Sequence, residues 1–584
     1  MGSVGEAKRP NFLVIVADDL GYSDIGPFGS EIPTPALDFL ANTGVRLTNF
    51  HTASACSPTR SMLLSGTDHH IAGLGQMAEH MPPNARDTPG YEGYLNFRVA
   101  ALPEVLQDSG YETMMAGKWH LGTTKETSPS ARGFEKSFVF LSGCHNHFNY
   151  EPHLEDPNHS VLNINAAKMW MHDSAFIDRT KDIPADFYST TSYSQAIINQ
   201  LKTRDTSKPF FAYLAFTAPH WPLQAPQSVI AKYKGHYNDG PEALRTKRVT
   251  QLARLGLISP DVAVAPMCHG PTEWSEMTEA ERVESARKME VFAAMVDLID
   301  QNIGKVLDHL DATGELDNTF ILFMSDNGAE GALLEAMPIM GGASKISSII
   351  DKYFDNSLDN IGNADSYVWY GPAWATASMA PSRGFKTWIT EGGIRCPCIV
   401  RYPPAFGNST NNQAYQTAIV NGGAHPPQTG VHTDSFATVM DIFPTILALA
   451  DVPIPDPVKP FRGRNIVPIR GTSWLPHLAN KTAQFHPSPE EITGWELFNS
   501  RAIRQGPYKA LWMAAPRGKD RWELYDVEKD PGEGVDLAED EAHRGVLERL
   551  VACWERYVSE TGLVDDPVWG AEVDAEVGIV WGGR

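Results

Sequence analysis

The sequence predicts an α/β protein built around a large mixed, mostly parallel sheet. Residues 11–17, 210–216 and 319–324 are continuous apolar runs, which is typical of strands buried on both faces of a sheet. Helical patterns over residues 100–108 and 286–310 lie between these runs. Strands that alternate with helices indicate a parallel or mixed sheet, and such sheets carry their functional sites beyond the carboxyl ends of the strands.

A second, smaller α+β region follows the first. The chain has 584 residues, which is long for a single core. Prolines crowd residues 453–460, residues 501–511 and 521–526 alternate as antiparallel strands do, and residues 542–561 form a helical pattern. We therefore expect a small C-terminal domain with an antiparallel sheet and a terminal helix. The expected boundaries are residues 1–455 for the first domain and residues 456–584 for the second.

Each of the three apolar runs ends in polar side chains. Asp18 and Asp19 follow the first run, and His220 follows the second. Asp326 and Asn327 follow the third. Carboxylate and amide oxygens suit hard cations such as Ca²⁺ or Mg²⁺ rather than soft metals. A single acidic pair is more often a helix cap or a turn. Two such pairs, each at the end of a buried run, favour a metal site.

The segment of residues 56–66 carries the most informative motif. It reads CSPTRSMLLSG, and Pro58 suits the first turn of a helix. Cys56 then lies at the N-terminus of that helix, where free backbone N–H groups favour an anion. The pattern Cys-x-Pro-x-Arg matches the signature of the type I sulfatases, whose cysteine is oxidised to formylglycine. The whole chain resembles this family and is most similar to the microbial arylsulfatases, above all over residues 50–75, 386–397 and 495–536.

The resemblance implies a fold, a reaction and a cofactor set. The expected fold is the three-layer sandwich of the alkaline phosphatase superfamily. The expected reaction is hydrolysis of aryl or alkyl sulfate monoesters to an alcohol and inorganic sulfate. A formylglycine-generating enzyme converts Cys56, after which one hydroxyl of the hydrated aldehyde attacks sulfur and the other expels sulfate. The resemblance implies that Asp18, Asp19, Asp326, Asn327 and the modified Cys56 are the metal ligands. The expected ion is Ca²⁺, with Mg²⁺ as the alternative.

The resemblance also assigns roles to three residues around Cys56. Arg60, one helical turn later, steadies the hydroxyls of residue 56 and the sulfate oxygens. Lys118 binds the sulfate, and His120 contacts residue 56 and assists sulfate release. On an extended strand, the spacing of Lys118 and His120 points both side chains to one face.

Three further residues complete the expected site. His220 pairs with a lysine and protonates the leaving alcohol, and Lys386 binds the sulfate and leaving-group oxygens. Asp326 is the expected base for the attacking hydroxyl. The chain contains 19 histidines, and a single histidine is usually structural, so the roles of His120 and His220 depend on their motifs.

The charge of the chain restricts its partners. There are 48 basic and 71 acidic residues, and the net charge is −23. This excess of acid argues against a nucleic acid or an anionic membrane as a partner. A small sulfate ester is itself an anion, so it needs a local basic pocket, which Arg60, Lys118 and Lys386 would form.

The sequence also predicts where the protein works. The apolar run near the N-terminus, residues 12–17, is too short for a signal peptide. Residues 436–450 are interrupted by Asp441 and Pro444, so they indicate a buried helix rather than a membrane span. Six cysteines do not make a disulfide framework. We therefore expect a cytoplasmic protein, and the oligomeric state stays open.

Other functions compete with a sulfatase. A phosphonate monoester or phosphodiester hydrolase of the same superfamily would keep the formylglycine and the metal. A catalytically dead binding homologue predicts a broken set of site residues, whereas this set is complete. A plain metal-binding protein leaves the CSPTR motif unexplained.

Two segments and a group of aromatic residues are candidates for substrate specificity. Residues 234–284 and 331–370 carry none of the family's signatures and fall between the expected active-site strands. Five aromatic residues near the motifs either line an apolar mouth or belong to the core: Phe148, Tyr150, Trp221, Tyr370 and Trp374.

Overall fold

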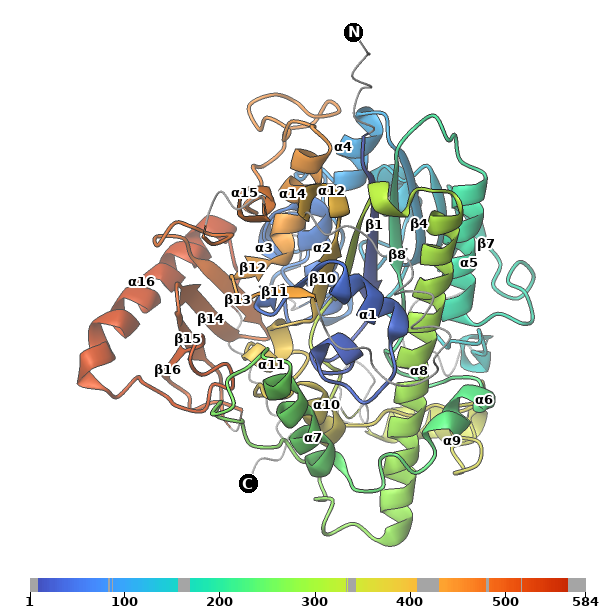
Figure 1. Cartoon of the computed structure of the whole chain (residues 1–584), viewed down its shortest axis with the longest axis vertical. Helices are drawn as coiled ribbons and strands as arrows, with labels where there is room; N and C mark the ends of the chain where they lie inside the picture. Colours follow the sequence, from blue (N-terminus) through green and yellow to red (C-terminus); the bar gives the residue numbers. More distant parts are fainter. Residues whose placement is uncertain are drawn as a thin grey trace.

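A ten-stranded mixed sheet forms the centre of the molecule in the computed structural model of the chain (Figure 1). The structure describes residues 9–565 except residues 82–83, 87, 156–168, 332, 334–342, 407–429, 479–482 and 516. The strands lie in this order across the sheet: β11 (Val431–Thr433), β2 (Val45–Leu47), β10 (Cys398–Arg401), β9 (Thr319–Ser325), β1 (Asn11–Ala17), β8 (Phe210–Ala215), β4 (Glu112–Lys118), β5 (Lys136–Phe140), β6 (Trp170–His172) and β7 (Ala175–Ile177).

The three predicted apolar runs form the middle of this sheet. Strands β9, β1 and β8 are buried along their whole length. They pair in parallel, and Ala17 of β1 lies opposite Ser325 of β9. Because this register ends both strands at the same level, the polar residues that follow them meet at one edge. The prediction of a mixed, mostly parallel sheet is confirmed.

Helices flank the sheet and complete the sandwich. Helices α1 (Pro35–Asn42) and α5 (Ser189–Lys202) both pack against the long helix α8 (Glu279–Ala312) (Figure 1). Helix α2 (Cys56–Ser65) instead packs with α4 (Leu102–Asp108).

Capping residues explain where two of these helices begin or end. Helix α8 begins earlier than its predicted start at residue 286, because Thr278 and Glu281 form a reciprocal capping box. Helix α2 begins at Cys56, with Pro58 in its first turn as predicted, and it ends at Gly66, which adopts a left-handed conformation.

The predicted C-terminal sheet and helix are also present. Four antiparallel strands form this sheet, and α16 (Arg544–Thr561) lies across it (Figure 1). Ile503, Leu524 and Trp554 are among the buried residues between the sheet and the helix. The position of the domain boundary at residue 455 stays a prediction. The strands are β13 (Thr493–Leu497), β14 (Ser500–Gln505), β15 (Tyr508–Trp512) and β16 (Trp522–Asp526).

A buried ionic cluster joins this small sheet to elements outside it. Lys509, on β15, lies 2.9 Å from Glu391 and 2.9 Å from Glu533. His51 Nε2 lies 2.8 Å from the other oxygen of Glu391. Glu391 begins the short helix α11 (Glu391–Ile394), which follows the Lys386 segment. The cluster therefore joins β15 to α11 and to β3 (Phe50–His51), which lies outside the ten-stranded sheet.

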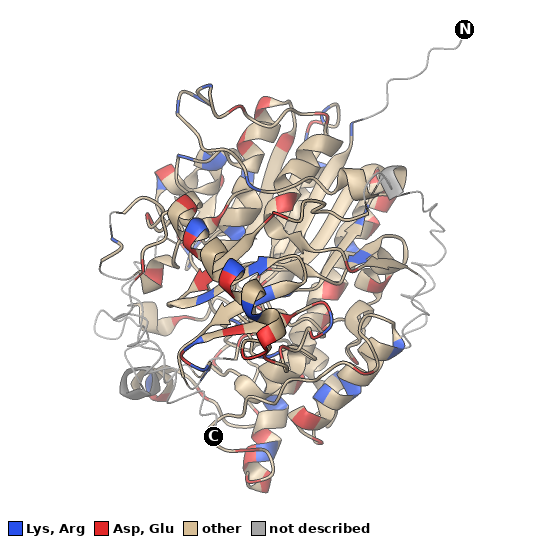
Figure 2. Cartoon of the chain, turned by 90° about the vertical axis from the view of Figure 1, so that its left-hand side faces the viewer, with Lys and Arg blue, Asp and Glu red and all other residues tan. Residues whose placement is uncertain are grey.

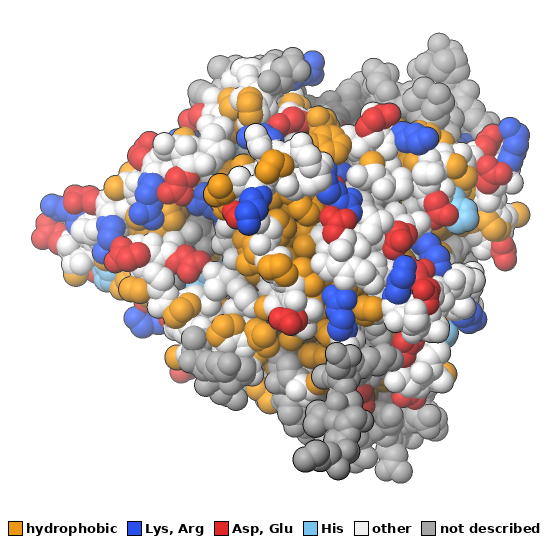
Figure 3. All heavy atoms as spheres, turned by 90° about the horizontal axis from the view of Figure 1, so that it is seen from above, with side chains coloured by type: hydrophobic (Ala, Val, Ile, Leu, Met, Phe, Trp, Pro, Cys, Tyr) orange, Lys and Arg blue, Asp and Glu red, His pale blue; other side chains and the backbone are white. Residues whose placement is uncertain are grey.

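The segment predicted as a buried helix contains α14 (Ile442–Leu449), most of which is buried. None of the helices among the described residues combines the length and the apolar character that a membrane span requires. Acidic and basic residues are mixed over the ribbon in Figure 2. Charged and apolar side chains also share the face seen in Figure 3, which is ordinary for a protein surface.

Candidate active site

The polar residues after β1 and β9 meet at the edge of the sheet. The backbone N–H of Asp19 donates to Asp326 Oδ1 at 3.2 Å, and Asn327 Nδ2 donates to Asp19 Oδ1 at 2.7 Å. These side chains, together with Asp18, are almost completely buried. Asp19 has a φ of 67°, a strained value for a residue with a side chain. The hydrogen bonds of Asp326 and Asn327 hold this conformation in place.

Cys56 faces this acidic group from the start of α2. One oxygen each from Asp18 and Asp326 lies within 4.8 Å of Cys56 Sγ. Burial raises the pKa of the Cys56 thiol, but the nearby charges of Lys118, His120 and Lys386 outweigh it and lower this pKa to about 7. The surroundings of residue 56 therefore favour an anion.

Arg60 reaches the same carboxylates as Cys56. Its Nε and Nη2 donate to Asp326 Oδ2 at 2.9 and 2.7 Å, and its Nη1 donates to the carbonyl of Lys118. Nη2 also lies 3.8 Å from Asp18. Arg60 is fully buried, so its positive charge acts on the site with little screening by water.

Lys118 and His120 both reach the site, but along a different backbone path from the one predicted. Lys118 ends β4, and its Nζ donates to both oxygens of Asp18 at 2.8 Å. His120 has a φ of 55°, so the chain is not extended through this residue and the expected strand geometry is wrong. The turn brings His120 Nδ1 to 3.2 Å from Cys56 Sγ.

His220 and Lys386 approach the site from the side of Asp19. His220 Nε2 lies 3.4 Å from Asp19 Oδ2, and Lys386 Nζ donates to the same oxygen at 2.9 Å. His220 Nδ1 lies 2.7 Å from the carbonyl of Trp221, which makes Nδ1 the donor of the ring. Burial lowers the pKa of His220 well below its usual range, although Asp19 opposes this effect.

A close backbone contact explains the glycine that follows Asn327. A Cβ on Gly328 would lie 2.0 Å from the carbonyl oxygen of Gly392. Only glycine therefore lets the turn after β9 pack against α11. This packing brings the Lys386 segment beside Asn327.

The acidic group has the properties of a cation site. Burial raises the pKa of Asp18 well above its usual range, with Lys118 opposing and Asp326 and Asp19 adding to the rise. For Asp19, Lys386 and His220 outweigh the effect of burial and lower the pKa to about 2. Asn327 Oδ1 is buried and has no hydrogen-bond donor. Crowded carboxylates and an unpartnered amide oxygen are the donor set that a hard divalent cation requires.

Two acidic residues of the site carry no motif and were not predicted from the sequence. Glu79 Oε1 lies 2.9 Å from His120 Nε2. Glu330 Oε2 lies 2.9 Å from Lys386 Nζ. Neither residue follows a pattern that sets it apart from the other acidic residues of the chain, so only the folded structure reveals their positions.

The predicted aromatic residues divide between the core and the site. Trp374 is buried and packs edge-on against Tyr237 and Trp274, which places it in the core. The Trp221 ring lies close to His220, tilted by 50° and with ring centroids 4.5 Å apart. Trp221 therefore lies next to the site, whereas Tyr150 is 39% exposed.

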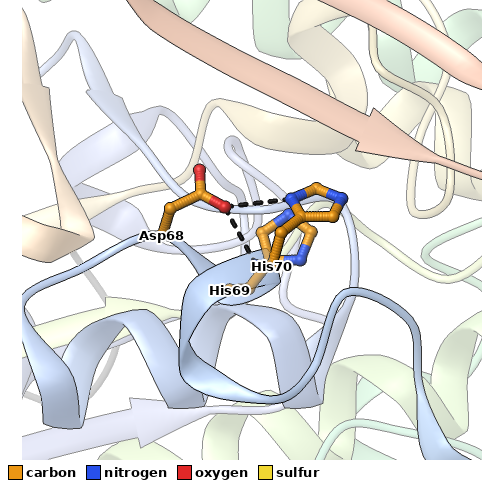
Figure 4. A group of neighbouring side chains, drawn as sticks. All are labelled: Asp68, His69 and His70. Carbon is orange, nitrogen blue, oxygen red and sulfur yellow. Dashed lines mark hydrogen bonds and ion pairs between the residues drawn. The ribbon is translucent and has the colours of Figure 1, made fainter. Parts of the chain in front are cut away.

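A second cluster of potential metal ligands, Asp68, His69 and His70, is explained by contacts within the protein (Figure 4). His70 Nδ1 lies 2.9 Å from Asp68, and His70 Nε2 lies 3.2 Å from Glu496. Tyr557 donates to the other oxygen of Asp68. Asp68 and Glu496 outweigh the effect of burial and raise the pKa of His70 to about 9. Both ring nitrogens of His70 are taken up by carboxylates of the protein, and this cluster joins α3 (His69–Ala72) to the C-terminal sheet.

Several known proteins are similar to this chain. The sulfatase family profile matches residues 10–452. An uncharacterized sulfatase of Schizosaccharomyces pombe is 51% identical over 566 residues, covering 96% of each chain. An arylsulfatase of Klebsiella aerogenes is 35% identical over 469 residues, covering 80% of this chain and 92% of that protein. The crystal structure of Ps i-CgsB in complex with k-i-k-neocarrahexaose superposes with a TM-score of 0.64 at 22% identity, covering 98% of each chain, which shows a shared fold.

The mixed sheet with a charged cluster at the ends of its strands, together with the family match over residues 10–452, defines a hydrolase. The chain belongs to the sulfatase family, and its reaction is the hydrolysis of sulfate esters. The resemblance stated from the sequence is thereby confirmed.

Proposed function

We propose that this sulfatase cleaves sulfate monoesters with a formylglycine formed from Cys56 by a formylglycine-generating enzyme. The observation that carries the proposal is the position of Cys56, which faces Asp18 and Asp326 and lies 3.2 Å from His120. An unmodified thiol has no second hydroxyl with which to expel sulfate. When present, the formylglycine supplies two hydroxyls on one carbon.

We further propose that Asp18, Asp19, Asp326 and Asn327 hold a divalent cation, Ca²⁺ with Mg²⁺ as the alternative. The buried carboxylates and the unpartnered Asn327 Oδ1 support this assignment. When bound, the cation supplies positive charge that polarises a hydroxyl of residue 56 and a sulfate oxygen.

The basic residues of the site bind the sulfate group in this proposal. Arg60, Lys118 and Lys386 are buried, and each one is already paired with a carboxylate of the acidic group. Fixed charges in a dry site stabilise the charge that develops on the sulfate oxygens. They also make a positive pocket within a protein of net charge −23.

The acid–base residues lie on two sides of residue 56. His120 Nδ1 faces residue 56, and Asp326 is within reach of it as a base for the attacking hydroxyl. His220 lies on the side of Asp19 and Lys386, and because its pKa is lowered, its protonated form readily gives its proton to the leaving alcohol. Histidine is the side chain that most often donates a proton to a leaving group in this way.

The proposed substrate is a small aryl or alkyl sulfate. Trp221 beside His220 gives the leaving-group side an aromatic surface, and the Klebsiella aerogenes relative is named as an arylsulfatase. The test compares the turnover of p-nitrophenyl sulfate and alkyl sulfates with that of phenyl p-nitrophenyl phosphate. The protein used must have a Cys56 conversion measured by mass spectrometry. Faster hydrolysis of the phosphate diester would overturn the proposal in favour of a phosphodiester hydrolase.

A further inference from the structure

Glu79 contacts the side of the His120 ring that faces away from Cys56. Glu79 Oε1 lies 2.9 Å from His120 Nε2, while His120 Nδ1 lies 3.2 Å from Cys56 Sγ. The ring thus lies between residue 56 and a carboxylate. Glu79 is in the 3-10 helix η2 (Ala78–His80), and it belongs to none of the motifs of the family.

We propose that Glu79 is a positioning residue, which keeps the proton of His120 on Nε2 and leaves the electron pair of Nδ1 free towards residue 56. An ionised carboxylate accepts hydrogen bonds and donates none, so the ring nitrogen that faces it must carry the hydrogen. The hydrogen bond made by one ring nitrogen sets the state of the other. The inference rests on the proposed function, because it assigns His120 to the same reaction.

The backbone near His120 leaves space for the His120 ring and the Glu79 carboxylate. The N–H of His120 donates to the carbonyl of Leu141 at 3.1 Å. A Cβ on Gly143 would lie 2.8 Å from Cε1 of His120 and 3.4 Å from Oε1 of Glu79. The glycine at position 143 therefore gives the ring and the carboxylate the space that they occupy together.

Glu79 also connects the buried ring to water. The side chain of His120 is 7% exposed, whereas that of Glu79 is 28% exposed. Both residues line a cavity of about 680 Å³, together with Glu126 and Met169. A proton that arrives on His120 can therefore leave through Glu79, whose side chain reaches solvent.

Glu79 acts in the step that releases sulfate. In this step, His120 Nδ1 takes the proton of a hydroxyl on residue 56. The electron pair left on that oxygen forms a C=O bond, and the C–O bond to sulfate breaks with its electron pair going to the sulfate. His120 ends the step with a proton on each nitrogen, and Glu79 stabilises this charged ring. A ring with its single proton on Nδ1 could not accept the proton.

The first experiment compares Glu79→Ala with Glu79→Gln and with the control Glu126→Ala. Glu126 lines the same cavity but makes no contact with His120 among the described residues. We expect Glu79→Ala to lower kcat on the order of 10- to 100-fold. KM should fall in the same proportion, a burst of alcohol should precede the steady state, and sulfate should remain bound to the protein. Glu79→Gln keeps an oxygen acceptor and should show a smaller effect, and Glu126→Ala none.

A merely structural role for Glu79 would give a different result. In that case kcat/KM would fall together with kcat, without a burst and without retained sulfate, and the inference would be overturned. If the wild-type protein with converted Cys56 hydrolyses no sulfate ester, the proposed function fails instead.

The second experiment tests Glu79 without turnover. In a Cys56→Ser background, position 56 carries a neutral hydroxyl that does not compete for the ring proton. Nitrogen-15 NMR of the neutral His120 ring should then show the proton on Nε2. Adding Glu79→Ala should give a mixture of the two forms, whereas adding Glu126→Ala should change nothing. An unchanged ring in the Glu79→Ala protein would contradict the inference.

Discussion

Lys118 Nζ lies 2.8 Å from both carboxylate oxygens of Asp18, and both residues are fully buried. A purely structural role does not explain why this buried carboxylate pairs with a lysine and lies close to Asp19 and Asp326. Removing charges from water costs several kcal/mol per ion. The arrangement is explained if a cation and an anionic substrate bind at the same edge of the sheet.

Asp18→Asn should weaken metal binding and turnover together. The substitution removes one of the acidic charges that face Cys56, so we expect activity to fall on the order of 10²- to 10³-fold. The metal content per chain, measured by mass spectrometry after dialysis, should fall with it. Asp178→Asn is the control, because the Asp178 side chain is 42% exposed and pairs with Lys181. A variant with normal metal content would contradict the assignment of Asp18 as a ligand.

Chelation offers a test on the unaltered protein. Removal of divalent ions with EDTA should abolish hydrolysis, and Ca²⁺ should restore it. Restoration by Mg²⁺ alone would select the alternative ion. Full activity in chelator, with no metal detected on the protein, would contradict the cation site.

His220→Ala should cause a loss that depends on the leaving group. A residue that protonates the departing alcohol matters most when that alcohol is a poor leaving group. Across a series of phenyl sulfates, the ratio of wild-type to variant kcat should therefore rise with the pKa of the phenol. His172→Ala, at an exposed position on β6, should leave every rate unchanged. The same loss for all phenols would argue against an acid role.

The contact between His70 and Glu496 predicts how stability depends on pH. The folded-state pKa of His70 is raised to about 9, above its ordinary value of 6.5. A group with a raised pKa stabilises the fold fully below its unfolded value, and this contribution is lost as the pH rises through the folded value. Asp68 next to it has a lowered pKa, so its contribution is lost in acid as the pH falls below about 3.8.

His70→Gln should therefore lower the stability of the protein most in the pH range where both His70 and Asp68 are charged in the folded state. Breaking a buried ion pair costs roughly 3–5 kcal/mol. The difference in Tm between wild type and variant should be largest at pH values from roughly 4 to 6.5, and it should shrink as the pH passes about 9. Thermal unfolding followed by circular dichroism across this range measures it. A difference that does not change with pH would show that His70 is uncharged in the folded protein.

Much of the fold could be predicted from the sequence, because its central strands are buried on both faces. Strands of this kind need apolar residues at every position, and such runs stand out from the rest of the chain. The polar residues at the carboxyl ends of those runs indicated the edge at which the site lies. Asp18 and Asp326 could therefore be predicted from the ends of these runs, and Cys56 from the CSPTR motif.

The parts that could not be predicted depend on tertiary contacts. His120 reaches Cys56 through a left-handed turn, and the strand spacing did not indicate this turn. Glu79 comes from a short 3-10 helix, and its partner is 41 residues away. Lys509 reaches Glu391 across 118 residues and joins the C-terminal sheet to α11. Pairs of this kind follow from how the elements pack, and local sequence patterns do not record them.

The most direct test of the account is the rate of p-nitrophenyl sulfate hydrolysis measured against the fraction of Cys56 converted to formylglycine. Preparations with different degrees of conversion should give rates proportional to that fraction, extrapolating to zero for unconverted protein. Cys56→Ala should be inactive while keeping its Tm and its metal, and Cys553→Ala, on α16, should behave as wild type. Substantial hydrolysis by protein without formylglycine would contradict the account.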